Sequence, residues 1–130
     1  MSNQNKQHLS VLPEHYAICQ LAADAPTPDW AQTQSSFVSI TRTTEELSIM
    51  CPQKVVPEDV TCERNWRGLK IEGPFELSSL GILASVVTPL SGAGMSVFAV
   101  ATYNTDHILI KEHELERAIT ILQQDGHTIR

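Results

Sequence analysis

The chain has 130 residues, of which 42% are hydrophobic and 18% charged, and its formal net charge is −6. A negative balance without a basic stripe argues against nucleic acid as a partner, because binding to phosphates needs a positive surface. No apolar run reaches the roughly 18 residues of a membrane span. The polar start MSNQNKQHLS lacks the apolar core of a signal peptide. We therefore expect a cytoplasmic protein with one compact domain or two very small ones.

The first part of the chain predicts strands and loop. Residues 1–7 are typical of a frayed terminus, residues 14–21 of a short strand, and the proline-containing stretch 22–36 of a loop. Residues 37–42 alternate with strand period and residues 47–51 return, which predicts a hairpin.

The middle of the chain is ambiguous between helix and turn. Pro57, Glu58 and Asp59 resemble the first turn of a helix, with proline at the first helical position and acids near the positive helix end. We expect a short helix within residues 52–65, followed by a strand over residues 66–73.

The last part of the chain carries two apolar stripes with helical spacing. Pro89 lies near the end of the first and cannot donate to the Ser85 carbonyl, so the last turn should be distorted. The predicted elements are a helix over 78–90, strands over 95–103 and 107–111, a helix over 112–126, and an edge strand over 127–130.

From Trp66 onward the predicted order is strand, helix, strand, strand, helix, strand. This is the ferredoxin-like βαββαβ pattern of the α+β class. Both helices should cover one face of a four-stranded antiparallel sheet, because their apolar stripes need that cover.

The two predicted hairpins align when the sequence is shifted by 61 positions. Similarity by chance is the alternative, since all hairpins share a period of two. A duplication would give two ferredoxin-like units in tandem, over residues 8–65 and 66–130. The first would be degenerate, with its helices reduced to the stretch around Trp30 and to residues 57–64. The matched pairs are Phe37 with Phe98, Thr41 with Thr102, Thr44 with Thr105, Glu45 with Asp106, Leu47 with Ile108, and Ile49 with Ile110.

Several segments together resemble the ACT-domain family in its stand-alone bacterial double form, similar to the CASTOR-type amino-acid sensors. The segments are FVSITRTTEELSIMCP, WRGLKIEGP, LGILASVVTPLSGAGMSVFAVATYNTDHILIKEHELERAITIL and GHTI. The resemblance implies ACT-like units that pair side by side and bind an amino acid at their junction. Some related proteins are labelled aspartate kinase-like, and that label would reflect a regulatory region.

A free amino acid needs an acceptor for its ammonium and N–H donors for its carboxylate. Asp106 is suited to the ammonium, and the start of the predicted helix near Gly81 offers backbone N–H groups and a favourable dipole. The resemblance implies that the positions from Thr102 to Asp106 line the pocket. The candidate ligand-binding residues are Ser79, Leu80, Gly81, Thr102, Tyr103, Thr105 and Asp106.

Simpler roles compete at these positions. Asn104 and Asp106 are ordinary turn residues, and Tyr103 could be the edge of the core with its hydroxyl in water. Gly81 would equally serve close packing of a helix on a sheet.

Other chemistry has little support in the sequence. The three cysteines, Cys19, Cys51 and Cys62, form no C-x-x-C pair, which favours reduced thiols over a disulfide. No two histidines have the spacing of a helical zinc site, so we expect no metal. No phosphate loop, nucleophile elbow or paired acid motif is visible, so we expect no cofactor and no enzyme activity.

Two functions remain. The favoured hypothesis is a regulatory sensor that binds a small molecule, an amino acid, at the junction of two ACT-like units, and thereby changes a homo-oligomer or a protein partner. The alternative is a structural or oligomerisation module without a ligand.

Overall fold

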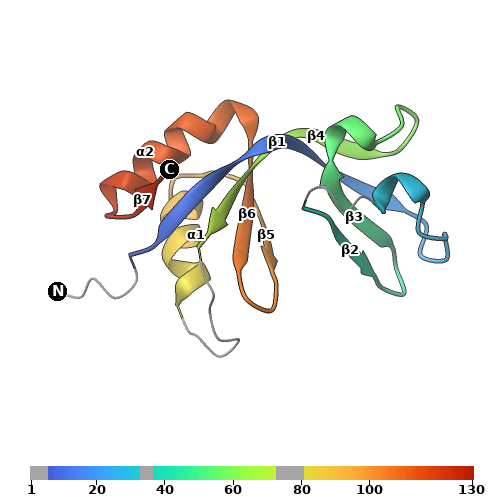
Figure 1. Ribbon diagram of the computed structural model, residues 1–130, viewed down its shortest axis with the longest axis horizontal. Helices are drawn as coiled ribbons and strands as arrows, with labels where there is room; N and C mark the ends of the chain where they lie inside the picture. The colour runs from blue at the N-terminus through green and yellow to red at the C-terminus, as the bar shows by residue number, and fades with distance from the viewer. Residues whose placement is uncertain (1–5, 33–36, 73–80) are drawn as a thin grey trace. The chain divides into compact units, whose positions relative to one another are not determined.

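The computed structural model describes residues 6–32, 37–72 and 81–130. The chain divides into two compact units (Figure 1). Unit 1 comprises Met1–Pro13 and Arg67–Arg130, and unit 2 comprises Glu14–Trp66. Strands β1 (His8–Leu21) and β4 (Cys62–Ile71) each contribute residues to both units. Residues 8–13 therefore pack with the C-terminal part of the chain, whereas the division expected from the sequence placed them with residues 14–65.

Unit 1 has the βαββαβ element order expected from the sequence. Its sheet order is β7-β1-β4-β6-β5, because the first part of β1 lies between β4 and β7. β1 and β7 pair in parallel, with Leu9 opposite Ile129, so the prediction of a four-stranded antiparallel sheet is wrong: β1 adds a fifth strand and a parallel pair. Besides β1 and β4, its elements are α1 (Ile82–Gly92), β5 (Val97–Ala101), β6 (Asp106–Lys111), the 3₁₀ turn η3 (Glu112–Glu114), α2 (Leu115–Gln124) and β7 (Thr128–Ile129).

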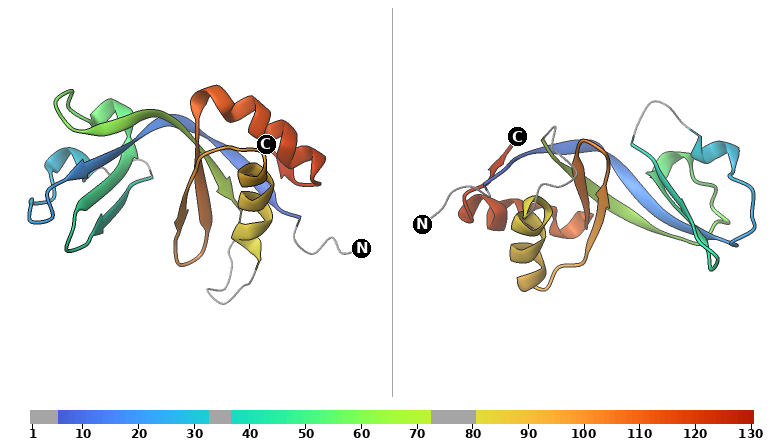
Figure 2. Two further views of the ribbon diagram at one scale, coloured as in Figure 1. Left: turned by 180° about the vertical axis from the view of Figure 1, so that it is seen from behind. Right: turned by 90° about the horizontal axis from the view of Figure 1, so that it is seen from below.

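Both helices of unit 1 pack against one face of its sheet, as Figures 1 and 2 show. Alternation along β6 directs Ile108 and Ile110 to the helices, and neither is exposed. The apolar stripes of α1 and α2 thus follow from their packing against this face of the sheet. The fully buried members of this core are Leu9, Leu69, Ile71, Val86, Leu90, Ile108, Ile110, Ala118 and Leu122.

The proline in α1 leaves one carbonyl without its helical donor, and a histidine supplies the missing hydrogen bond. Pro89 lies inside α1, which continues to Gly92. The Ser85 carbonyl lies 3.0 Å from Nε2 of His127. The other ring nitrogen, Nδ1, accepts from the Gln7 amide at 3.0 Å, so Nε2 is the atom that carries the proton in the neutral ring. The expected loss at Pro89 is thus offset by a residue 38 positions later in the chain.

Unit 2 repeats the same element order with single 3₁₀ turns in place of both helices. Its sheet order is β2-β3-β1-β4. The turn η1 contains Trp30, where the sequence predicted a reduced helix. Its remaining elements are η1 (Asp29–Ala31), β2 (Ser39–Arg42), β3 (Leu47–Pro52) and η2 (Gln53–Val55).

The short helix expected within residues 52–65 is wrong. Only η2 forms there, and β4 already begins at Cys62. The amide of Val60 donates to the Pro57 carbonyl at 3.4 Å, which closes one turn and no more. Proline followed by two acids suits a turn as well as a helix start, and no apolar stripe is present to hold a helix against the sheet.

The hairpins of the two units are equivalent, but at a shift of 59 positions instead of 61. Arg42 pairs with Leu47 in unit 2, and Ala101 pairs with Asp106 in unit 1. Each closing pair therefore encloses four residues. A shift of two positions preserves which side chains face the core, so periodicity alone does not distinguish the two alignments.

Candidate functional site

The turn between β5 and β6 is held by its own threonines. The Thr102 amide donates to the Thr105 carbonyl at 2.8 Å, and the Thr105 amide donates to the Thr102 hydroxyl at 3.1 Å. The Thr102 hydroxyl lies 2.9 Å from the Thr105 carbonyl and 2.7 Å from the Thr105 hydroxyl. Thr102 and Thr105, two of the predicted site residues, thus form the turn with their hydroxyl groups, which accounts for part of the polarity between β5 and β6.

The corresponding turn of unit 2 uses the same device. The Thr43 amide donates to the Glu46 carbonyl at 2.9 Å, and the Thr43 hydroxyl accepts from the Glu46 amide at 3.2 Å. Thr43 is thus the structural counterpart of Thr102, in place of Thr41, which the sequence alignment had matched to it.

Tyr103 lies at the tip of the turn and does not close a cavity. Its side chain is 77% exposed, and Asn104 is exposed beside it. The sequence also allowed Tyr103 to be a residue at the edge of the core, and its exposure is too high for that role. A single exposed tyrosine is common on protein surfaces and does not by itself indicate a binding site.

Asp106 occupies a different environment from the turn residues. It is the first residue of β6 and is half-buried. Because side chains alternate along a strand, it lies on the same face as Ile108 and Ile110, which pack against the helices. Within the described residues its carboxylate makes no hydrogen bond and no ion pair, and it acts on His107 through its charge. Asp106 therefore belongs to the helix-covered face of β6 and not to the turn.

The start of α1 is the second part of the predicted site. Gly81 precedes the helix in the left-handed conformation, with φ 83°, and no side chain caps this end. The Ser85 amide donates to the Gly81 carbonyl at 2.9 Å and begins the helical hydrogen bonds. Ser79 and Leu80 lie outside the described residues. Figure 1 places the start of α1 and the β5–β6 turn at the same end of unit 1.

His107 lies on the opposite side of β6 from Asp106 and is buried, with 8% of its surface exposed. Burial lowers the pKa of His107 below its ordinary value of 6.5, and the nearby Lys70 ammonium lowers it further. The Asp106 carboxylate acts in the opposite direction. The neutral imidazole is thus the form that the fold favours.

The stability of the protein should consequently fall as the pH is lowered through 6.5. The unfolded chain takes up the His107 proton at about pH 6.5 and the folded chain only at lower pH, so stability is lost from 6.5 down to the folded pKa. In urea unfolding at several pH values, His107→Gln should flatten this slope. His113→Gln, at an exposed histidine, controls for the loss of an imidazole. An unchanged slope in His107→Gln would show that another group is responsible.

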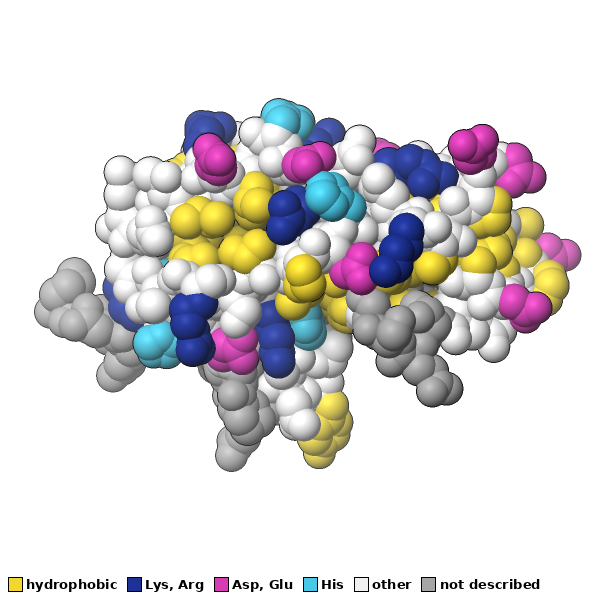
Figure 3. Space-filling view, turned by 45° about the horizontal axis from the view of Figure 1, so that its top comes forward, with side chains coloured by type: hydrophobic (Ala, Val, Ile, Leu, Met, Phe, Trp, Pro, Cys, Tyr) yellow, Lys and Arg dark blue, Asp and Glu magenta, His cyan; other side chains and the backbone are white. Residues whose placement is uncertain are grey.

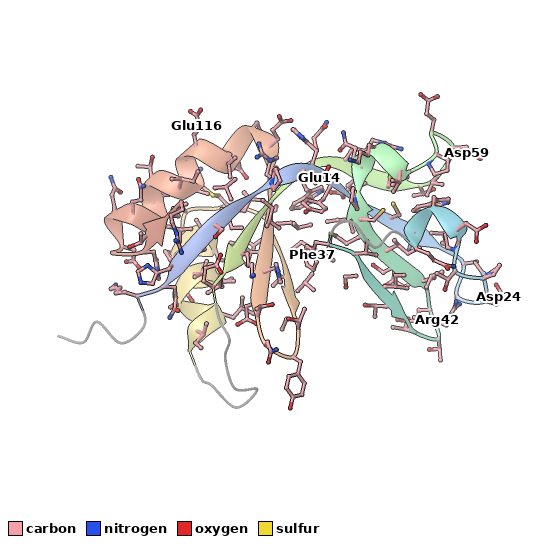
Figure 4. The ribbon with its side chains drawn as sticks, viewed as in Figure 1. Glu14, Asp24, Phe37, Arg42, Asp59 and Glu116 are labelled. Carbon is pink, nitrogen blue, oxygen red and sulfur yellow. The ribbon has the colours of Figure 1, made fainter. Side chains whose placement is uncertain are left out.

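Unit 2 contains a polar hollow that sequence reasoning did not find. It has a volume of about 330 Å³ and is lined by Glu14, His15, Gln53, Lys54 and Asn65. Figure 4 labels Glu14 on β1. Lys54 lies 3.3 Å from the Glu14 carboxylate, and Gln53 donates to the Asn65 side chain at 3.1 Å. These groups already satisfy one another, so a ligand would have to displace them.

Two other classes of site have no structural counterpart within residues 6–32, 37–72 and 81–130. No three histidine, cysteine or acidic side chains there have the arrangement of a metal site. Neither helix of this part of the chain has the length and apolarity to cross a bilayer.

Figure 3 shows cationic and acidic side chains interspersed on the face in view, without a large area of one charge sign.

Comparison with known proteins gives matches over most of the chain. The family model described as ACT domain matches residues 61–124, and a second model, described as an N-terminal domain, matches residues 14–59. The crystal structure of protein Atu0741 from Agobacterium tumefaciens is 38% identical with a TM-score of 0.90, covering 96% of this chain and 92% of that one.

More distant relatives include sensors and regulatory subunits. The "Cytosolic arginine sensor for mTORC1 subunit 1" of Bos taurus is 35% identical over 81 residues, which is 57% of this chain, and the human protein is 32% identical over 77 residues. The chain spans about a quarter of the length of these curated relatives. The regulatory subunit of aspartate kinase from Thermus thermophilus, at 10% identity, shares the fold with a TM-score of 0.64, covering 91% of this chain and 97% of that one. The βαββαβ order and the family-model match together establish that residues 61–124 of the chain belong to the ACT-domain family.

Proposed function

We propose that this protein is a non-catalytic regulatory sensor that binds a free amino acid. The observation that carries the proposal is the 35% identity with a cytosolic arginine sensor over 81 residues. L-Arginine is accordingly the first ligand to test, and a cytoplasmic location like that named for the relative is part of the proposal. The binding of an amino acid would favour one of two states of the protein, and so regulate a partner or an oligomer.

The proposed ligand contacts in unit 1 come from Asp106 and the start of α1. Helix starts leave backbone N–H groups without helical partners and carry partial positive charge, which suits a carboxylate. Asp106 on the helix-covered face suits an ammonium, and ion-assisted hydrogen bonds are the strong ones. Thr102 and Thr105 shape the turn that presents Asp106. The placement of the ligand at the junction of two ACT-like units stays a prediction.

A thermal-shift screen with the twenty amino acids tests the proposal. A ligand at 100 times its dissociation constant should add about 2.7 kcal/mol to the free energy of unfolding. Agmatine, which lacks the carboxylate of arginine, and N-acetylarginine, which lacks the free ammonium, separate the two proposed contacts. Each should stabilise the protein less than L-arginine does. A folded protein whose melting temperature no amino acid raises would contradict the proposal.

A second candidate function is a structural or oligomerisation module. It is supported by β5, whose only neighbour among the described strands is β6, and whose residues VFAVA carry no charge. Such an edge is prone to pair with another chain. If this function holds and sensing does not, the mass from light scattering will exceed that of the monomer at all concentrations of amino acid.

A further inference from the structure

The three cysteines gather on one face of the unit 2 sheet, although they are far apart in sequence. β1 lies between β3 and β4, and the three strands carry Cys19, Cys51 and Cys62, respectively. In the β1–β3 register Ala17 is opposite Cys51 and Cys19 is opposite Ile49. Cys51 is therefore diagonal to Cys19 on the same face. Both belong to the core of unit 2, and Cys62 packs against it.

One backbone hydrogen bond between β1 and the residue before β4 implies that Cys62 lies opposite Cys19. The Gln20 amide donates to the Thr61 carbonyl at 3.0 Å, which makes these two residues a hydrogen-bonded pair of antiparallel strands. The next pair is Cys19 with Cys62, and alternation makes it a pair without backbone hydrogen bonds. Cα atoms in such pairs lie about 4.5 Å apart, within the range of about 4.4–6.8 Å found in disulfides.

The thiols themselves are in contact. All three cysteines are free thiols, and Cys51 and Cys62 both lie close enough to Cys19 to shift its pKa. Diagonal neighbours across a sheet have Cα atoms about 7–8 Å apart. That separation exceeds the disulfide range, so Cys51 is less suited than Cys62 to bond with Cys19.

Access and charge distinguish Cys62 from the other two. Cys19 is 2% exposed and Cys51 is 0% exposed, whereas Cys62 is half-buried. Burial raises the pKa of Cys62, and the neighbouring Cys19 acts in the same direction, whereas the positive charge of the Arg64 guanidinium favours the thiolate. Because the thiolate is the nucleophile, its reaction with an oxidant should become faster as the pH rises above neutral.

We propose that Cys19 and Cys62 form a reversible disulfide when the protein meets a hydroperoxide. The Cys62 thiol first loses its proton to solvent, and the thiolate attacks the peroxide, so that an S–O bond forms and the O–O bond breaks. The departing hydroxide or alkoxide takes up a proton from solvent and leaves as water or an alcohol. The Cys19 thiol then attacks the sulfenic sulfur. The S–S bond forms, the S–O bond breaks, and the departing hydroxide takes the Cys19 proton and leaves as water. Two thiols are oxidised by two electrons, and one peroxide is reduced.

The sequence makes the bond easy to assign, because trypsin sites at Arg42 and Lys54 separate the three cysteines into different peptides. The whole protein is first reduced, and denaturing thiol titration should then count three thiols. After treatment with hydrogen peroxide and its removal by catalase, the count should fall to one. The peptide map should contain the Cys19 peptide linked to the Cys62 peptide, and dithiothreitol should restore all three thiols.

Matched variants identify the partners. Cys51→Ala should lose both of its thiols on oxidation, whereas Cys62→Ala should keep both. Three remaining thiols in the parent would overturn the proposal, provided that glutathione in the same tube is oxidised. A bridge that contains Cys51, a link between two chains, or oxidation to sulfinic acid without a bridge would also overturn it. The peptide map of the parent decides the matter even where a variant fails to fold.

Discussion

Leu122→Ala should lower the free energy of unfolding by about 2–5 kcal/mol, the range for truncation of a fully buried leucine. Leu122 is 0% exposed and belongs to the core that α1 and α2 form with the unit 1 sheet. The loss combines transfer of the side chain to water with the cavity that remains, since α2 is held by packing more than by its own propensity. Urea denaturation monitored by circular dichroism measures it.

Gln123→Ala is the matched control for this change. Gln123 is the next residue on α2 and its side chain is exposed, so its truncation should alter stability by no more than about 0.5 kcal/mol. If Leu122→Ala lowers the free energy of unfolding by less than about 1 kcal/mol, the core of unit 1 either relaxes around the cavity or does not pack tightly around Leu122.

Asp106→Asn should weaken the binding of the amino acid found in the screen by about 1.5–3 kcal/mol, the range for a hydrogen bond to a charged group. This corresponds to a dissociation constant roughly 10 to 150 times higher. The substitution keeps the size of the side chain and removes its charge. Because the carboxylate makes no hydrogen bond within the described residues, the free energy of unfolding should change little. Isothermal titration calorimetry measures the affinity.

Glu45→Gln provides the control for a general change in net charge. Glu45 is an exposed acid in the corresponding turn of unit 2, so its neutralisation should leave the affinity unchanged. If Asp106→Asn binds the ligand as tightly as the parent does, Asp106 only serves the turn, and the amino-acid sensor then needs another ammonium acceptor. If Glu45→Gln weakens binding equally, the effect is one of overall charge.

The β2–β3 and β5–β6 turns show which features can be predicted from residues that are neighbours in the sequence. Threonine at the first turn position predicts hydrogen bonds to nearby backbone, and both Thr43 and Thr102 make them. The sequence alignment nevertheless matched Thr102 to Thr41. Strand alternation repeats every two residues, so the wrong alignment satisfied the apolar pattern as well as the right one. Only the pairing of Arg42 with Leu47 and of Ala101 with Asp106 decides between them.

Contacts between residues that are distant in the sequence could not be predicted, for a different reason. The missing donor at Pro89 is a local property and was predictable, but the group that replaces it, His127, comes from another element. The three cysteines likewise carry no short motif, and adjacency of β3, β1 and β4 alone brings their sulfurs together. The hollow beside Glu14 is assembled from residues of three separate segments in the same way.

The sequence by itself determined the helices and strands of unit 1 and their βαββαβ order, because apolar periodicity is a local signal that burial imposes on each element. The sequence placed Gly81 within a helix over residues 78–90 and Asp106 in the turn before a strand, whereas α1 begins at Ile82 and Asp106 is the first residue of β6. The tertiary structure alone decided that residues 8–13 pack with unit 1 and that 3₁₀ turns replace the helices of unit 2. Those outcomes depend on which strands pair. Strand pairing is set by contacts between residues that are distant in the chain, and such contacts cannot be predicted from one segment alone.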